Sequence, residues 1–104
     1  MPVLAIFEYA VKPGRMADFM AKLQAAADPK FDSPVMPQSV RLYRSSVPGP
    51  DTGGVTLMIE YADMRSYGLR TDFENKNDEW RKLFEAQPDS PETLLSVELL
   101  TQLS

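Results

Sequence analysis

Residues 3–27 read VLAIFEYAVKPGRMADFMAKLQAAA, and their hydrophobic period changes partway along. Val3 to Val11 is rich in β-branched and aromatic residues, a composition that predicts a strand. The strand should stop at Lys12-Pro13-Gly14, because proline lacks the N–H that a sheet ladder needs and glycine permits a turn. From Arg15 the apolar spacing is that of one helix face, and Asp28-Pro29 should end the helix. That face comprises Met16, Phe19, Met20, Leu23 and Ala26 or Ala27, with Asp18, Lys22 and Gln24 on the solvent side.

Two further strands are expected in the middle of the chain. Residues 30–38 are polar and interrupted by prolines, which predicts a surface loop placed to form a cavity rim or a lid. Ser39 to Val47 then alternates between apolar and other residues and ends at the turn Pro48-Gly49-Pro50-Asp51. Gly53-Gly54 precede a third strand, which should form a hairpin with the second. In this third strand Val55, Leu57, Ile59 and Tyr61 should point one way and Thr56, Met58 and Glu60 the other.

The remaining segment predicts helix and then strand. Asp63 is a good N-cap, since its carboxylate can accept from the free amides of a first helical turn. Helical spacing then runs through Tyr67, Arg70, Phe73, Asn77, Trp80 and Phe84. Gly68 and Thr71-Asp72 are the expected places of a bend or split, so we predict one long or two short helices ending before Pro88. Leu94 to Leu103 should form the fourth strand, with Leu94 and Leu100 on one face and Leu95, Val97 and Leu99 on the other.

The resulting order, βαββαβ, predicts one α+β domain over residues 1–104. Its fold should be a ferredoxin-like sandwich, a four-stranded antiparallel sheet with the helices on one face. The other face has no cover of its own, although three of the strands carry apolar residues on both sides. Strands of that kind are usually buried on both sides, and a twofold dimer is the commonest solution. We therefore expect a homodimer.

Composition excludes several classes of function. The 104 residues include no cysteine and no histidine, which removes thiolate chemistry, Cys-type zinc sites and imidazole haem ligands. No Asp-rich loop indicates another metal site, and we expect no bound metal or cofactor. The net charge of −4 argues against nucleic acid. No signal peptide or membrane-length apolar run is found, so a cytoplasmic protein without membrane contact is expected.

The chain resembles a known superfamily over nearly its whole length. The opening strand that ends Val11-Lys12-Pro13-Gly14-Arg15, the hairpin, and Tyr61-Ala62-Asp63 leading into a helix are similar to the dimeric α+β barrel superfamily. That superfamily includes antibiotic-biosynthesis-type monooxygenases, EthD-like proteins and NIPSNAP-like proteins. Tyr61, Asp63 and Arg65 with Trp80 downstream are similar to the NIPSNAP pattern at stretched spacing. The resemblance implies two sheets that pair into a dimeric α+β barrel.

One departure from the superfamily bears on activity. Its cofactor-independent monooxygenases commonly place an asparagine, a tryptophan and a histidine around the substrate, and its haem-degrading members use a histidine to hold iron. This chain has Asn75, Asn77 and Trp80 but no histidine. Haem binding through imidazole is excluded, and the monooxygenase interpretation lacks its most recognisable residue.

The candidate site follows from the alternation of the strands. If Val3, Ala5, Phe7 and Val11 face the helices, a polar residue from each strand points to the uncovered face. Carboxylates held close together there would have raised pKa values and could act as an acid or base. The catalytic candidates are Glu8, Glu60 and Tyr43, and the ligand-binding candidates are Arg41, Met58, Glu98, Tyr67 and Trp80.

Each candidate also has a structural interpretation. Arg41 could hold a ligand carboxylate or phenolate bidentately, or it could pair with Glu8, Glu60 or Glu98 across strands or across a dimer interface. Trp80 lies on the apolar stripe of its helix, which is more typical of a core residue. Arg70 is expected on a solvated helix face.

Two hypotheses of function remain at this stage. The first is a small-molecule-binding protein or cofactor-independent enzyme, monooxygenase- or isomerase-like, that acts on an apolar or aromatic ligand in the barrel cavity. Proton transfer would fall to Glu8, Glu60 or Tyr43, and Arg41 would orient the substrate. The alternative is a non-catalytic interaction module whose sheet face serves only dimerisation.

Overall fold

The computed structural model describes residues 1–46 and 54–104 of the chain. Its elements are β1 (Val3–Val11), α1 (Met16–Ala26), the short 3-10 helix η1 (Pro29–Phe31), β2 (Ser39–Arg44), β3 (Gly54–Tyr61), α2 (Met64–Lys76), α3 (Asp78–Phe84) and β4 (Glu92–Thr101). This order confirms the predicted βαββαβ arrangement, with the second helical segment divided in two. Val47, the turn Pro48–Asp51 and Gly53 lie outside the described residues.

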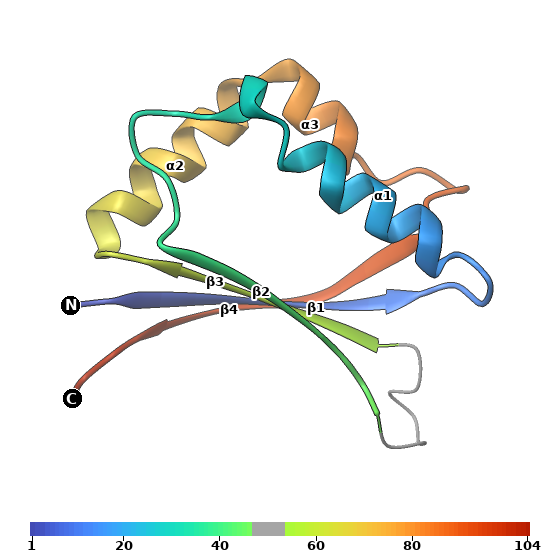
Figure 1. Ribbon diagram of the computed structural model, residues 1–104, viewed down its shortest axis with the longest axis horizontal. Helices are drawn as coiled ribbons and strands as arrows, with labels where there is room; N and C mark the ends of the chain where they lie inside the picture. The colour runs from blue at the N-terminus through green and yellow to red at the C-terminus, as the bar shows by residue number, and fades with distance from the viewer. Residues whose placement is uncertain (47–53) are drawn as a thin grey trace.

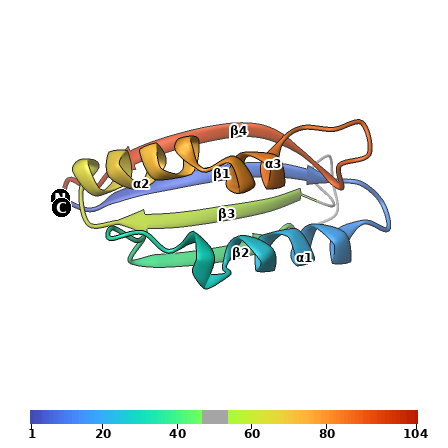
Figure 2. The same ribbon diagram turned by 90° about the horizontal axis from the view of Figure 1, so that it is seen from above.

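The four strands form one antiparallel sheet in the order β2-β3-β1-β4. Figure 1 shows all the helices on one side of this sheet, and Figure 2 shows α1 over the β2 side and α2 and α3 over the β4 side. No described helix covers the opposite side. The ferredoxin-like α+β fold expected from the sequence is therefore confirmed.

The core lies between α1 and the inner strands. Phe19 of α1 is completely buried and packs against Tyr9, Val55 and Leu57 on the sheet. The rings of Tyr9 and Phe19 lie 5.1 Å apart in a tilted arrangement. Burial of apolar side chains on this side of β1 and β3 fixes which face of each strand points to the helices.

The register confirms the predicted faces of the strands. On β1 the buried residues Val3, Ala5 and Tyr9 face the helices, so Glu8 points to the uncovered side. Glu8 lies opposite Thr56 of β3 and Ser96 of β4. The Cα pairing therefore sets these three side chains on the same face.

A β-bulge makes one expectation for β4 wrong. The register between β1 and β4 shifts between Glu8 and Tyr9, so that Ser96 pairs with Glu8 while Leu94 pairs with Tyr9. Leu95 is the extra residue of the bulge. Leu94 consequently lies on the helix side and Leu100 on the opposite side, whereas strict alternation placed them together.

The helical region from Met64 onward breaks at a different residue from those expected. Asp63 is confirmed as the N-cap of α2, and its Oδ1 accepts from the backbone N–H of Ser66 at 2.7 Å. The break lies at Asn77 rather than at Gly68 or Thr71-Asp72. The Asn77 side chain accepts from the backbone N–H of Trp80 at 3.0 Å and so begins α3. A side-chain cap outweighs the weak helix propensity of glycine and threonine here.

Lys22 is largely covered, contrary to its predicted place on the solvent side of the first helix. Its Nζ lies 2.7 Å from Oε2 of Glu92 on β4, and the two side chains are 11% and 8% exposed. The ammonium also lies 5.5 Å from the centroid of the Phe84 ring. The wet face of α1 is thus partly covered by α3 and by the start of β4, which local periodicity could not reveal.

Candidate functional site

The uncovered side of the sheet carries a mixed apolar and charged surface, here called the open face. From the register its members are Leu4, Ile6, Glu8 and Ala10 on β1, Ser39, Arg41 and Tyr43 on β2, Gly54, Thr56, Met58 and Glu60 on β3, and Thr93, Ser96, Glu98 and Leu100 on β4. Six of the eight candidate residues, Glu8, Glu60, Tyr43, Arg41, Met58 and Glu98, lie here. The sheet brings them together from four strands.

Glu8 holds the most central charge of this face. It lies on an inner strand, is half-buried, and its Oε2 accepts from the Thr56 hydroxyl at 3.1 Å. Within the described part of the chain its Oε1 makes no hydrogen bond. Its neighbours on the open face are the short side chains of Thr56, Ser96 and Ala10 and the longer side chain of Ile6. Glu8 thus has one carboxylate oxygen held by Thr56 and short side chains beside it on β3 and β4.

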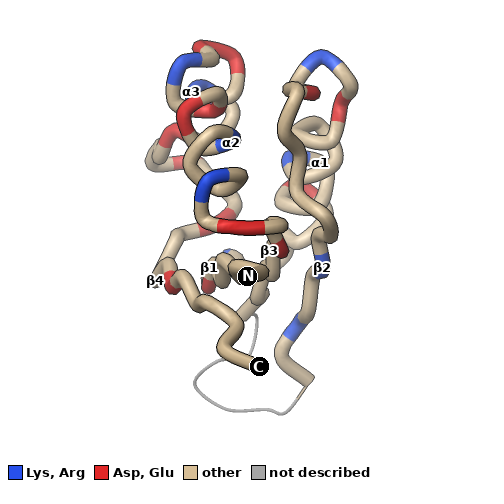
Figure 3. The backbone as a smooth tube through the Cα atoms, turned by 90° about the vertical axis from the view of Figure 1, so that its left-hand side faces the viewer, with Lys and Arg blue, Asp and Glu red and all other residues tan. Residues whose placement is uncertain are grey.

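Arg41 lies at the edge of the sheet and makes no ion pair with any described residue. It shares a row across the strands with Met58, Ile6 and Glu98. Figure 3 shows basic positions on β2, at one edge of the sheet, and acidic positions toward β4. Among residues 1–46 and 54–104 no hydrogen bond or salt bridge of the Arg41 side chain is found. The described contacts therefore include no ion pair of Arg41 with Glu8, Glu60 or Glu98 of the same chain.

Glu60 and Tyr43 occupy the rows on either side of the Arg41 row. Half-buried Glu60 lies between Ser39 and Leu4. Tyr43 lies opposite Thr56 in the Glu8 row, and its side chain is exposed. A ligand seated over Thr56 would touch both Glu8 and Tyr43, whereas Glu60 is four residues further along β3.

Tyr67 and Trp80 belong to the helix layer and not to the open face. The Tyr67 ring packs edge-on against Tyr61 at 5.4 Å. Trp80 packs edge-on against Phe31 at 5.3 Å and lies 5.0 Å from Phe84. Trp80 is half-buried within this helix layer, and neither side chain can share a ligand with Glu8 through the sheet.

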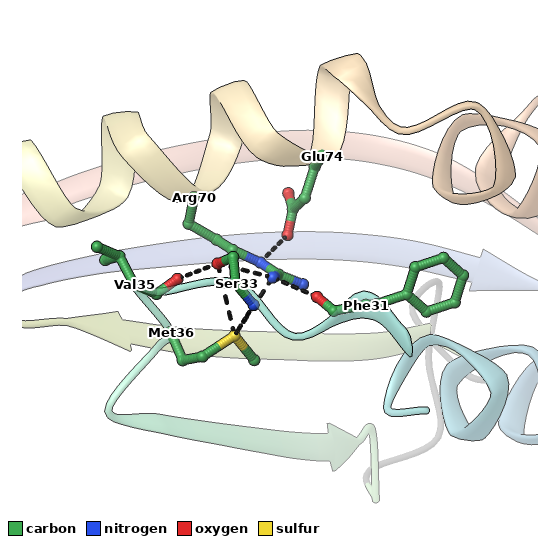
Figure 4. A network of polar contacts seen from close by, with 6 residues as sticks. All are labelled: Phe31, Ser33, Val35, Met36, Arg70 and Glu74. Atoms are coloured by element: carbon green, nitrogen blue, oxygen red, sulfur yellow. Dashed lines mark hydrogen bonds and ion pairs between the residues drawn. The ribbon is translucent and has the colours of Figure 1, made fainter. Parts of the chain in front are cut away.

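Arg70 lies in a buried polar cluster, contrary to its predicted place on a solvated helix face. Arg70 is 3% exposed, and Figure 4 shows its side chain reaching from α2 to the segment after η1. Its Nη1 donates to the carbonyl oxygen of Phe31 at 2.6 Å, and its Nε donates to Oε2 of Glu74 at 3.0 Å. Further contacts of the guanidinium are Ser33 Oγ at 3.1 Å, Met36 Sδ at 3.3 Å, and the rings of Phe73 and Trp80 at 4.8 and 5.2 Å. The predicted rim or lid segment is thus fastened to α2.

Burial governs the titration of the groups near this cluster. It raises the pKa of the Glu74 carboxyl, and the Arg70 charge offsets only part of that rise. Burial also raises the pKa of Tyr61 to about 12, with a smaller contribution from the nearby Glu74 charge. Burial likewise raises the pKa of Tyr9 to about 12, and the nearby Glu92 charge adds a smaller contribution. These three groups lie on the helix side of the sheet and not on the open face.

A shallow groove lies on the outer surface between α1 and α3. Its volume is about 410 Å³, and it is lined by Ala25, Asp28, Lys30, Phe31, Glu79, Lys82 and Leu83. Lys30 Nζ and Glu79 Oε2 form an exposed ion pair at 2.9 Å there. Since the groove contains none of the candidate residues, it is a separate feature from the open face.

The described residues hold neither a metal cluster nor a membrane-spanning helix. Within residues 1–46 and 54–104 no three acidic side chains lie close enough to hold a metal ion. None of the helices in that part of the chain is long and apolar enough to cross a membrane.

Solved structures with the same fold support the architecture. A putative antibiotic biosynthesis monooxygenase from Bordetella bronchiseptica is 28% identical, with a TM-score of 0.65 over 99% of this chain and 98% of that one. An uncharacterised NIPSNAP-like domain protein from Burkholderia xenovorans is 14% identical, with a TM-score of 0.70 over 99% and 86%. A NIPSNAP family protein from Agrobacterium tumefaciens is 12% identical, with a TM-score of 0.66 over 96% and 90%.

At the level of sequence, no protein-family model and no curated protein matches the chain. The structural neighbours are monooxygenase-like and NIPSNAP proteins, so the resemblance to the dimeric α+β barrel superfamily is confirmed at the level of the fold.

Proposed function

We propose that the protein binds a small, largely apolar molecule on the open face, where Glu8 accepts a hydrogen bond or a proton from it. A second copy of the chain closes the site. The observation that carries this proposal is the position of Glu8, a half-buried carboxylate with one oxygen held by Thr56 and the other without a described partner.

The distribution of side-chain size supports a cavity at Glu8. Around it the strands β1, β3 and β4 present Ala10, Gly54, Thr56 and Ser96, all of them short, and Tyr43 on the edge strand β2 is the long side chain of the same row. The rows toward the other end of the sheet carry long side chains, which are Leu4, Glu60, Leu100, Ile6, Met58, Arg41 and Glu98. Packed sheets lie about 10 Å apart, a distance that long side chains fill and short ones do not. Covering the open face would therefore leave space above Glu8.

The need for a cover follows from the apolar members of the face. Leu4, Ile6 and Met58 are only half-buried, and Leu100 is exposed. Contiguous apolar surface of this kind is typical of association sites. Ligand sites are usually concave and bury most of their ligand, which a single bare sheet cannot do.

We further propose that the protein is a cofactor-independent enzyme of monooxygenase or isomerase type. Either reaction can begin with transfer of a proton from a ligand O–H or C–H to a carboxylate, the role assigned to Glu8. Tyr43, in the same row, can hydrogen-bond the resulting anion, while Arg41 in the next row adds positive charge. The putative monooxygenase from Bordetella bronchiseptica, 28% identical over nearly the whole chain, supports the oxygenase variant.

Ligand-dependent thermal unfolding tests the proposal. We expect a member of a panel of small phenols and aromatic acids to raise the unfolding midpoint of the wild type, because a ligand that binds only the folded state stabilises it by mass action. Glu8→Gln keeps the shape but cannot take up a proton, and should lose most of the shift. The matched control, Glu60→Gln, changes a carboxylate on the same face but away from the short side chains, and should keep it. Equal shifts in both variants would contradict the role of Glu8.

The interaction-module alternative rests on β4. Its exposed residues Leu94, Leu95 and Val97, together with Leu100, give this edge strand apolar surface on both sides. If no compound shifts the midpoint of any variant while the chain is dimeric, the open face serves association alone.

A further inference from the structure

We propose that Met36 is an oxidation site, and that its sulfoxide tightens the contact between the segment 31–36 and α2. The oxidant is a peroxide, which transfers one oxygen atom to the thioether sulfur. Reductases return methionine sulfoxide to methionine, so the modification is reversible. The site belongs to the helix layer and is independent of Glu8 and of any second copy.

The sulfur of Met36 is reachable from solvent and has hydrogen-bond donors beside it. The residue is 42% exposed. Its Sδ lies 3.3 Å from the backbone nitrogen of Ser33 and 3.3 Å from Nη1 of the buried Arg70. Figure 4 shows the thioether turned toward both residues. An oxidant can therefore reach the sulfur, and an oxygen added there forms next to a fixed positive charge.

Met36 differs in this respect from the other exposed methionines, which are Met1, Met20 and Met64. Within residues 1–46 and 54–104 no hydrogen bond reaches the sulfur of any of these three. Peroxide should modify them as well, because oxidation follows exposure. Only at Met36 does the new oxygen meet a buried guanidinium, so only there does the modification gain a partner within the fold.

The donors around Met36 suit a stronger acceptor than a thioether. Both hydrogens on Nη1 of Arg70 are shared among three acceptors, the Phe31 carbonyl oxygen at 2.6 Å, Ser33 Oγ at 3.1 Å and Met36 Sδ. The thioether is the weakest of these acceptors. A sulfoxide oxygen carries partial negative charge, and hydrogen bonds from an ionised donor are the strong ones. Because Met36 is partly exposed, its end can shift toward solvent and leave room for this oxygen.

The oxygen transfer balances with hydrogen peroxide as the co-reactant. The sulfur lone pair attacks one peroxide oxygen, and the O–O bond breaks as the S–O bond forms. The departing hydroxide takes the proton of the transferred oxygen and leaves as water. Sulfur loses two electrons and peroxide gains them. The N–H of Ser33 and the guanidinium of Arg70 can donate to the departing oxygen while charge develops on it.

The place of Met36 in the chain gives the modification a structural effect. Arg70 already joins α2 to the Phe31 carbonyl and to Ser33. Two residues after Met36, the backbone N–H of Gln38 donates to the carbonyl oxygen of Glu60 at 2.7 Å, where the chain joins the sheet. A firmer contact at Met36 therefore strengthens the path from η1 to β2.

Peroxide treatment followed by tryptic digestion locates the modification. Cleavage after Lys30 and Arg41 releases the peptide FDSPVMPQSVR, residues 31–41, in which Met36 is the only methionine. We expect this peptide to gain one oxygen in mild hydrogen peroxide while the protein keeps its folded circular dichroism spectrum. A peptide 31–41 that stays unmodified while Met20 in the peptide 16–22 is oxidised would overturn the proposal.

Thermal unfolding of the treated protein measures the effect on the fold. The unfolding midpoint of the wild type should rise by about 4 °C relative to that of Met36→Leu treated in the same way. Met36→Leu keeps all the other methionines, so the difference between the two responses belongs to Met36. A wild-type midpoint that falls, or that changes only as the control does, would refute the tightening.

Substitution supplies a test that needs no oxidant. Met36→Gln sets a carbonyl oxygen close to the place of the sulfoxide oxygen, and should unfold about 4 °C above Met36→Leu. In an Arg70→Met background the donor is absent, so the two variants should differ by much less. Equal midpoints with Arg70 present, or a margin that persists without it, would contradict the assigned role of the guanidinium.

Discussion

Replacement of Arg70 by methionine should destabilise the protein more than replacement of any exposed residue of α2. Methionine keeps an unbranched stem of similar course but removes the guanidinium. The carbonyl of Phe31 then loses a donor at 2.6 Å, and the carboxylate of Glu74 loses one at 3.0 Å. The stacking of the guanidinium on Phe73 and Trp80 is lost as well.

The size of the effect follows from burial. Hydrogen bonds to charged groups contribute about 1.5–3 kcal/mol each, and breaking a buried ion pair costs about 3–5 kcal/mol. The Glu74 side chain is 22% exposed and can recover some hydration, which places the expected loss near the lower end. We predict a decrease of about 3 kcal/mol in the free energy of unfolding, a large part of the total for a domain of this size.

Urea denaturation at neutral pH and at one fixed protein concentration measures the change. The matched control is Arg65→Met, which alters an exposed arginine of the same helix and should change stability by less than about 0.5 kcal/mol. A loss for Arg70→Met no larger than that of the control would refute the view that Arg70 fastens residues 31–36 to α2.

Three further predictions concern the helix side of the sheet. Burial raises the folded-state pKa of Glu74, so the stability it contributes is present below its unfolded pKa and is lost as pH rises through the folded value. In urea denaturation the stability of Glu74→Gln relative to the wild type should therefore be higher at pH 7 than at pH 5. Parallel pH profiles of the two proteins would contradict this. Because the pKa of Tyr9 and of Tyr61 is about 12, part of the tyrosinate absorbance of the folded protein should appear well above pH 10, and this transition should move to lower pH in urea. The free energy of unfolding should fall between about pH 10 and 12. A single absorbance transition near pH 10 in the folded protein would be evidence against the burial of the two side chains. Lys22→Met leaves the carboxylate of Glu92 buried without its partner, so the free energy of unfolding measured in urea should fall by about 3 kcal/mol. The double variant Lys22→Met with Glu92→Leu should recover part of that loss. An unchanged stability of the single variant would show that the pair is not formed.

The faces of the inner strands could be predicted from the sequence because alternation is a local property. Val3, Ala5 and Tyr9 form one apolar set on β1, and the same pattern in β3 confirms the choice of face. Once these faces are set, the side of Glu8 and Glu60 follows from the period of two. This is why most of the candidate residues were placed together correctly.

Local periodicity does not predict burial where a third element covers a helix or strand. Lys22 and Arg70 occupy polar positions of amphipathic helices, yet β4 covers one and the segment after η1 covers the other. Phe31 is buried in a segment whose prolines predicted a simple loop. The bulge at Leu95 depends on pairing with β1, and nothing in the spacing of the β4 leucines signals it. Only the spacing of Arg70 and Glu74, four residues apart, hinted at a paired arginine.

Sedimentation equilibrium of the wild-type chain over a wide concentration range tests the central claim, that the open face is covered by a second copy and so encloses Glu8. The account predicts a mass of about twice the 11.7 kDa of one chain at micromolar concentration. A mass of 11.7 kDa at every concentration would contradict it, because Glu8 would then lie on a bare surface.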